Sequence, residues 1–190
     1  MLARSLTHGR FGWVVEADIK GFFTNLDHDW MVKMLEERVE DRAFIRLIRK
    51  WMKAGVLEED GEVVHPATGT PQGGIISPIL SNIYLHYVLD LWFEKVVEKK
   101  CKGGATILRY ADDFVCAFQY KEDAERFLNA LIKRLGKFHL EVAPEKTRML
   151  RFSRYKEPAN EMCMHFGTPR PRIMETINRQ QEFNWKGSAK

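Results

Sequence analysis

Long apolar runs and a framework of cysteines are both missing from this sequence. No stretch approaches the roughly 20 apolar residues that a membrane-spanning helix needs, and residues 1–10 lack the apolar segment of a secretion signal. The three cysteines, Cys101, Cys116 and Cys163, are odd in number and far apart, which predicts neither disulfides nor a zinc-ligand pair. These absences predict a soluble, intracellular protein that has no membrane partner.

A strong net charge is also missing. The 190 residues carry a formal charge of +4, and the whole excess lies in residues 151–190, which hold 8 basic and 4 acidic residues. A basic tail suits nucleic acid, and a solvated terminus explains so small a bias equally well. The length predicts one domain with a real core, followed by a basic, partly irregular tail at 153–190.

Three carboxylates stand out against this background. Asp112 and Asp113 lie between the strand-like runs 106–108 and 115–118, which predicts a β-hairpin with both acids at its tip. Asp18 ends a third apolar run, 11–17. Mg²⁺ prefers carboxylate oxygens and keeps positions open for substrate phosphates. An Asp-Asp pair at a turn is weak evidence by itself, because aspartate favours turns for local hydrogen-bonding reasons.

The predicted order of elements is strand, helices, hairpin, helix, strand. This order is typical of an α+β fold, a split βαβ arrangement in which helices pack on an antiparallel sheet. The sheet would place Asp18 beside the acidic hairpin and so build a carboxylate cluster for metal ions. The spacing of apolar residues predicts four helices. One follows Asp27 and has Met31, Met34 and Leu35 on one face, and one follows Asp41 and has Phe44, Ile48 and Trp51 at helical spacing. The other two cover residues 79–100 and 121–138.

Four motifs follow one another along the chain: Asp18-Ile19-Lys20-Gly21-Phe22-Phe23, Thr70-Pro71-Gln72-Gly73-Gly74-Ile75-Ile76-Ser77-Pro78, Tyr110-Ala111-Asp112-Asp113 and Glu145-Lys146-Thr147. In this order they resemble the palm motifs of reverse transcriptases, and most closely those encoded by group II introns. The resemblance covers about residues 13–152 and implies a polymerase palm of the ferredoxin or RRM-like type, with residual fingers elements.

The resemblance implies an RNA-directed DNA polymerase that uses two Mg²⁺ ions, with Mn²⁺ as a substitute. Asp18 and Asp112 would bind the ions, Asp113 would support the site, and the backbone carbonyl of Ile19 would complete it. The ions would activate a primer 3′-hydroxyl and neutralise the departing pyrophosphate. Lys146 would be the general acid that protonates pyrophosphate.

The resemblance also implies how nucleotides are selected. Phe23 matches a bulky gate that leaves no room for a ribose 2′-hydroxyl. Pro71, Gln72 and Gly73 would line the incoming nucleotide and the template base. Tyr110 would lie near the primer end, with Arg109 beside it. The expected partners are an RNA template such as intron RNA, a DNA primer and deoxynucleotides, in the bacterial cytoplasm or an organelle matrix.

The sequence departs from the family pattern at both ends. Few residues precede the Asp18 motif, where fingers are expected, and the primer-grip and thumb patterns are poorly matched after Phe152. We therefore expect a palm fragment with little activity alone, whose missing segments are supplied by other chains. Two alternatives remain open: a non-catalytic RNA-binding or splicing-helper (maturase) remnant, and a retron, diversity-generating or CRISPR-associated reverse transcriptase.

The gate assigned to Phe23 generates a testable prediction. Phe23→Ala should admit ribonucleotides, because the smaller side chain leaves space for the 2′-hydroxyl. The measurement is the ratio of deoxynucleotide to ribonucleotide incorporation in primer extension. An unchanged ratio in the variant would exclude this role for Phe23.

Overall fold

The central element of the fold is a strand that pairs on both of its sides. A computed structural model describes residues 11–53, 56–57, 63–64, 68–70, 76–153 and 163–165. β1 pairs antiparallel with β5 and with β6, β4 pairs antiparallel with β5, and β7 pairs parallel with β6. The sheet order is therefore β4-β5-β1-β6-β7. The strands are β1 (Trp13–Ala17), β4 (Ala105–Tyr110), β5 (Asp113–Phe118), β6 (Arg148–Ser153) and β7 (Cys163–His165).

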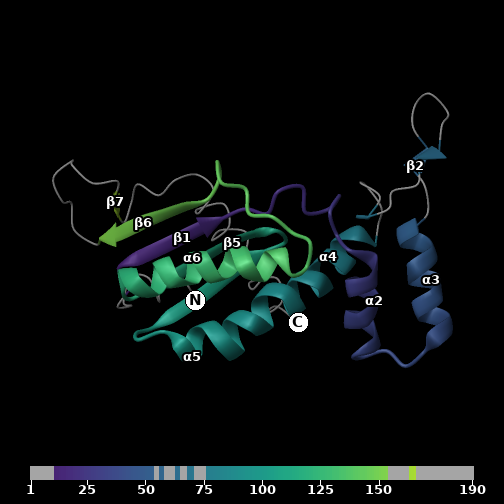
Figure 1. The fold of residues 1–190 in the computed structure, drawn as a ribbon, viewed down its shortest axis with the longest axis horizontal. Coiled ribbons are helices and arrows are strands. Elements are labelled where there is room, and N and C mark those ends of the chain that lie inside the picture. The colour runs from purple at the N-terminus through teal and green to yellow at the C-terminus, as the bar shows by residue number, and fades with distance from the viewer. Residues whose placement is uncertain are drawn as a thin grey trace, which may run out of the picture.

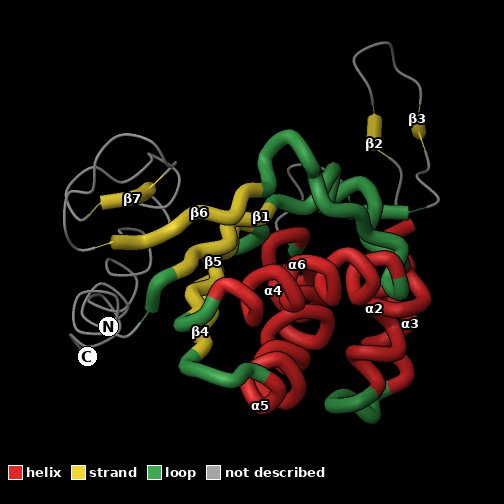
Figure 2. The backbone as a smooth tube through the Cα atoms, turned by 60° about the vertical axis from the view of Figure 1, so that its left-hand side comes forward, coloured by secondary structure: helices red, strands yellow, loops and turns green. Residues whose placement is uncertain are grey.

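The helices gather on one side of this sheet (Figures 1 and 2). α6 packs against β1 and β5, while α2 packs against α3 and α4 beyond one end of the sheet. A separate pair of short strands, β2 (Val56–Leu57) and β3 (Val63–Val64), is antiparallel. The helices are α2 (His28–Glu36), α3 (Arg42–Lys53), α4 (Ser77–Leu85), η1 (His86–Asp90), η2 (Phe93–Val97), α5 (Glu98–Lys100) and α6 (Lys121–Gly136).

This architecture confirms the α+β fold, helices on an antiparallel sheet, that the order of elements predicted. The acidic hairpin forms from β4 and β5, and β5 lies beside β1, as the position of Asp18 required. One strand was not predicted: β7 adds part of the tail to the sheet edge. The division between residues 1–152 and 153–190 remains a prediction. No helix within the described ranges has both the length and the apolar character to cross a bilayer.

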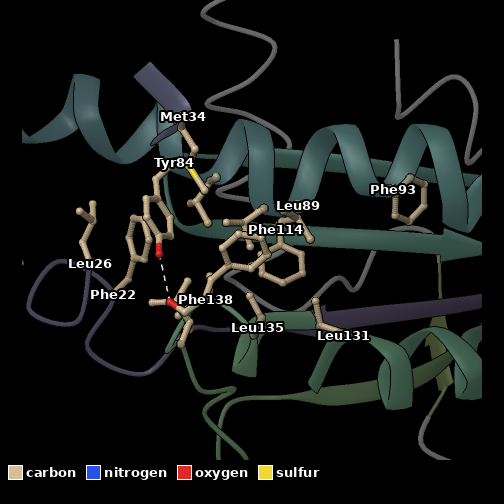
Figure 3. Close-up of a cluster of buried hydrophobic side chains, with 14 of the residues drawn as sticks. Phe22, Leu26, Met34, Tyr84, Leu89, Phe93, Phe114, Leu131, Leu135 and Phe138 are labelled. Atoms are coloured by element: carbon tan, nitrogen blue, oxygen red, sulfur yellow. Dashed lines mark hydrogen bonds between the residues drawn. The ribbon is translucent and has the colours of Figure 1, made fainter. Parts of the chain in front are cut away.

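The core forms where the helices meet the sheet, and aromatic rings fill much of it. Tyr84 is fully buried, and its ring lies 6.3 Å from the rings of both Phe22 and Phe138. Its hydroxyl donates to the Phe138 carbonyl at 3.0 Å (Figure 3), which satisfies a polar group that would be costly to bury unpaired. Burial raises the pKa of Tyr84 well above its ordinary value. The phenol therefore stays neutral and ties α4 to the chain after α6.

The long helix over residues 77–100 is wider than an α-helix in two places. The segments η1 and η2 are π-helical, a rare geometry that is often found near functional sites. Arg134 of α6 donates to the carbonyls of Tyr87 and Val88 at 3.1 and 3.0 Å, and its guanidinium lies over the Phe138 ring. Burial lowers the pKa of Arg134. This arginine therefore binds α6 to the wide segment η1.

In α3 the structure corrects the prediction of which apolar residues are buried. Ile48 is buried as expected, but Phe44 and Trp51 are 42% and 41% exposed. Ile45 and Met52 are buried in their place. Two stripes at helical spacing share Ile48, and the aliphatic one faces the core. The basic residues of this helix that lie three or four positions apart are all exposed: Arg42, Arg46, Arg49 and Lys53.

The start of α2 yields a prediction about stability. The carboxylate of Asp27 accepts from the Trp30 amide at 2.9 Å and contacts His139 Nδ1 at 2.7 Å. Burial alone would raise the pKa of Asp27, but these bonds outweigh it and lower that pKa from its ordinary value of 3.8. Because the folded pKa is depressed, the carboxylate stabilises the fold above pH 3.8 and loses this contribution as the pH falls through the folded value.

We therefore expect Asp27→Ala to lower the free energy of unfolding by about 1 kcal/mol at neutral pH, as loss of a helix cap does. The difference from wild type should shrink in acid. Urea unfolding at pH 7 and pH 3 measures both effects. Asp29→Ala, an exposed acid in the same first turn, is the matched control and should change stability less. A difference that is equal at both pH values would contradict the assignment.

Candidate functional site

The carboxylates of the first and third motifs meet through the register of β1 and β5. Ala17 pairs with Phe114, so the next position along this antiparallel register sets Asp18 opposite Asp113. Successive side chains alternate between sheet faces. Ala17 and Phe114 belong to the helix-covered core, which directs Asp18 and Asp113 together to the other face. The structure thus brings two of the predicted site residues to the same place.

Asp112 lies in the turn between β4 and β5. Tyr110 pairs with Asp113, which leaves Ala111 and Asp112 as the loop of a tight hairpin. Ala111 has a φ of 54°, a left-handed conformation that costs a residue with a Cβ about 1–2 kcal/mol. Such strain persists where the surroundings enforce it, and it concentrates at functional sites. Tyr110, at the end of β4, is 36% exposed.

Asp18 is held on its other side by the segment before β6. Its carbonyl accepts from the Ala143 amide at 2.8 Å. A turn at residues 144–146 follows, and the Lys146 ammonium lies 2.9 Å from the Asp18 carboxylate. The Asp18 side chain is 7% exposed, whereas that of Lys146 is 56% exposed. A cation thus already neutralises a nearly buried carboxylate, and it can reach solvent as well.

The backbone carbonyl of Ile19 points toward the hairpin. Ile19 forms an isolated antiparallel bridge with Val142, made by bonds from Ala143 to Asp18 and from Lys20 to Glu141. Carbonyls of successive residues in extended chain point to opposite sides. The Asp18 carbonyl faces the 141–143 segment, so that of Ile19 faces the side of β1 on which β5 lies. The role of this carbonyl as an oxygen donor remains a prediction.

The expected three-carboxylate cluster is not assembled among the described residues, so this donor set would share a Mg²⁺ ion with substrate oxygens. In the described part of the chain, no group of three or more histidine, cysteine, aspartate or glutamate side chains lies close enough to hold a metal ion. Mg²⁺ at nucleotide sites takes one or two carboxylates and completes its shell with water and phosphate oxygens, rather than a cage made of protein alone. The carboxylates and the carbonyl described above are hard donors of the kind this ion prefers.

The turn after β1 carries Phe23. Its ring packs 5.5 Å from that of Phe22, which is buried, while Phe23 itself is half-buried. The Phe23 carbonyl accepts from the Thr70 amide at 2.8 Å, and the Gly69 amide donates to Leu26 at 2.7 Å. Phe23, the predicted gate, is therefore tied through its backbone to the segment that leads into the glutamine motif. Pro71, Gln72 and Gly73 lie outside the described residues.

Arg109 has partners that the sequence did not indicate. Its guanidinium forms a bidentate pair with Asp90 at 2.8 and 2.7 Å, and it also donates to Asn82 and to the Ala111 carbonyl. Asp90 lies in η1 and Asn82 in α4. No local pattern marks these residues, because they come together only when the long helix packs beside β4.

A sheet with paired acids at a tight turn, backed by helices, is the arrangement expected of a polymerase palm. The family profile described as "Reverse transcriptase (RNA-dependent DNA polymerase)" matches residues 4–188. This chain belongs to the reverse transcriptase family.

Individual relatives agree with this assignment. The chain is 47% identical over 83 residues to the "Group II intron-encoded protein LtrA" of Lactococcus lactis subsp. cremoris, which is 42% of this chain and 14% of that protein. It is 45% identical over 84 residues to an "Uncharacterized 91 kDa protein in cob intron" of Schizosaccharomyces pombe, which is 44% of this chain and 10% of that protein. The matched segment is therefore a small part of each relative.

A solved structure supports the fold independently. The structure of telomerase from Candida albicans, in complex with a fragment of telomeric RNA, superposes with a TM-score of 0.61. The sequence identity is 15%, and the match covers 84% of this chain and 29% of that chain. At this identity the likeness establishes the fold alone. Reverse transcriptases as a family generally use divalent metal ions.

The contact between Gly69 and the Phe23 turn generates a prediction. Gly69 has a φ of +88°, and an added Cβ would lie 2.6 Å from the Phe23 carbonyl oxygen and 2.7 Å from that of Thr24. Gly69→Ala should therefore lower the free energy of unfolding by roughly 1–3 kcal/mol. Chemical denaturation measures the change.

The matched control is Gly136→Ala in α6. No atom lies within 4 Å of a Cβ at that position, and alanine favours a helix by up to about 1 kcal/mol over glycine. The control should be neutral or stabilising. Equal effects of the two substitutions would show that the segment at 68–70 does not hold the Phe23 turn.

Proposed function

We propose that this chain is the catalytic palm of a group II intron-type reverse transcriptase, which adds deoxynucleotides to a primer 3′-hydroxyl on an RNA template. The observation that carries the proposal is the β1–β5 register, which sets Asp18 opposite Asp113 and beside the strained turn that holds Asp112. A chain that only bound RNA would have no chemical need for Asp18 opposite Asp113 with a further acid, Asp112, in the adjoining turn.

The proposed metal ligands are Asp18, Asp112, Asp113 and the Ile19 carbonyl. Two Mg²⁺ ions, or Mn²⁺ in their place, would supply charge that lowers the pKa of the primer hydroxyl and neutralises the leaving pyrophosphate. The protein's part is to fix these oxygens before substrate arrives. The buried backbone bond between Asp18 and Ala143 supports that rigidity.

The reaction is an in-line displacement at phosphorus. The primer 3′-hydroxyl loses its proton to solvent, and its oxygen forms a bond to the α-phosphorus of the deoxynucleotide. The bond from that phosphorus to the bridging oxygen breaks, which releases pyrophosphate. Lys146 donates a proton to the leaving group. Its exposed ammonium on a flexible side chain permits this role. In the resting protein the ammonium contacts Asp18 at 2.9 Å, so it is already drawn toward the reacting centre.

Substrate selection is assigned to the Phe23 turn and the segment beside it. Phe23 excludes the ribose 2′-hydroxyl by its bulk, and Pro71, Gln72 and Gly73 line the nucleotide and its template base. The bond from the Thr70 amide to the Phe23 carbonyl supports a shared pocket for these residues. Tyr110 lies at the primer end.

The partners follow from the same chemistry. We infer an RNA template such as intron RNA, a DNA primer, and fingers and thumb segments that complete the polymerase. The relatives whose names describe them as intron proteins support this inference. The place of action is then the cytoplasm of a bacterium or the matrix of an organelle.

Primer extension tests the proposal. The assay uses an RNA template, a DNA primer, deoxynucleotides and Mg²⁺, with the chain as given and with the chain fused to fingers and thumb segments of a relative. We expect extension in the completed form and a loss of at least about 10²-fold in Asp112→Asn, since electrostatic stabilisation of the transition state is removed. Asp29→Asn, an exposed acid on α2, is the control and should retain activity.

The opposite result is equally specific. If no form extends the primer, while the chain binds RNA in a salt-sensitive manner, the chain is a binding remnant and the catalytic proposal is wrong.

A further inference from the structure

The Arg109 side chain lies at the centre of a bonding network next to the acidic turn. Its Nε and Nη2 donate to the two carboxylate oxygens of Asp90 at 2.8 and 2.7 Å. Its Nη1 donates to Asn82 Oδ1 at 2.9 Å and to the Ala111 carbonyl at 2.7 Å. The Arg109 side chain is only 12% exposed. A nearly buried cation with four short bonds has a well-defined position.

The network joins two parts of the site that are distant in sequence. Arg109 is in β4, immediately before Tyr110 and the acidic turn. Asn82 is in α4, the helix that begins at Ser77, four positions after the last residue assigned to the nucleotide, Gly73. Asp90 closes the wide segment η1, and His86 lies 3.6 Å from its carboxylate. One side chain thus links α4 to the turn that carries the proposed metal ligand Asp112.

The contact with Ala111 falls on the strained residue. The left-handed φ of 54° at Ala111 is unfavourable for an alanine, whose side chain has no hydrogen-bonding group to support it. The Arg109 bond to the Ala111 carbonyl fixes the orientation of the peptide between Ala111 and Asp112. The direction of the Asp112 side chain depends on that peptide.

We propose that Arg109 is a positioning residue that holds the acidic turn at a fixed place relative to α4, with Asp90 and Asn82 as its anchors. The inference rests on the proposed function for its catalytic consequence. Lysine is a poor substitute, because bonding to three partners in different directions requires the planar fork of a guanidinium.

The first test needs no metal and no activity. In metal-free protein labelled with ¹³C-alanine, the Cα and Cβ shifts of Ala111 report its φ. We expect Arg109→Gln to move these shifts toward averaged loop values and to broaden the signal, with a smaller change in Asn82→Ala. Unchanged Ala111 shifts in both variants would overturn the proposal.

A matched control separates positioning from the general loss of an ion pair. Arg126 also contacts an aspartate, Asp123 at 3.4 Å, and a backbone carbonyl, that of Lys100 at 3.2 Å. Arg126→Gln should leave the Ala111 shifts where they are in wild type. A shift of the same size in the control would show that Ala111 responds to any loss of charge, and would overturn the proposal. Asn82→Ala removes one exposed contact from α4, so it tests the network even if Arg109→Gln does not fold.

The second test uses the polymerase assay of the completed protein. Misplacement of the turn should lower kcat by about 10–10²-fold while the KM for deoxynucleotide changes little, because a small displacement of reacting groups has effects of this size. Mn²⁺ should restore part of the loss, because Mg²⁺ demands a more nearly ideal geometry. Arg109→Lys should fall short of wild type.

The outcomes distinguish this inference from the function on which it rests. If wild type does not extend a primer but Ala111 still responds to Arg109→Gln, the proposed function fails and the positioning stands. If wild type extends and Arg109→Lys and Arg109→Gln match its kcat with Mg²⁺, the positioning role is refuted while the proposed function stands.

Discussion

The antiparallel pairing of β1 with β5 is the constraint on which the rest of the structure depends. It places the carboxylate after β1 beside the acidic turn, and it separates the face that carries these acids from the face that the helices cover. Side chains alternate along a strand, so a slip of one residue would send Asp18 toward the aromatic core. The buried positions of Val15 and Ala17 oppose such a slip, because they would have to exchange faces with charged neighbours. Packing of the core therefore fixes the chemistry of the opposite face.

Contacts between backbone groups hold the pieces of the site in place around this pairing. The turn that carries Phe23 is bound through main-chain bonds to residues 69 and 70, and the end of β1 is bound in the same way to residue 143. Main-chain bonds do not depend on which side chains are present. The side chains of the site can therefore vary while the scaffold keeps their spacing.

Much of this arrangement can be predicted from the sequence. The remainder cannot, and the reasons are physical. Alternating and continuous apolar runs predicted the strands, and the paired acids predicted the tip of the hairpin. The prediction for the buried face of α3 is partly wrong. Ile48 belongs both to a stripe with Phe44 and Trp51 and to a stripe with Ile45 and Met52, and helical spacing alone does not show which stripe is buried. The ties of Arg109 to Asp90 and Asn82, and of Gly69 to the Phe23 turn, join residues far apart in the chain. Their partners are set by tertiary packing, which no local pattern records.

The π-helical segments of the long helix have a consequence for the comparison of relatives. A π turn holds more residues than an α turn, so each such segment rotates everything that follows it around the helix axis. Residues on either side of η1 therefore share a face at spacings that differ from the usual three or four. A relative whose helix is α-helical throughout would present the same faces with fewer residues. An alignment of the two must place its gap inside the helix, where gaps are ordinarily penalised most.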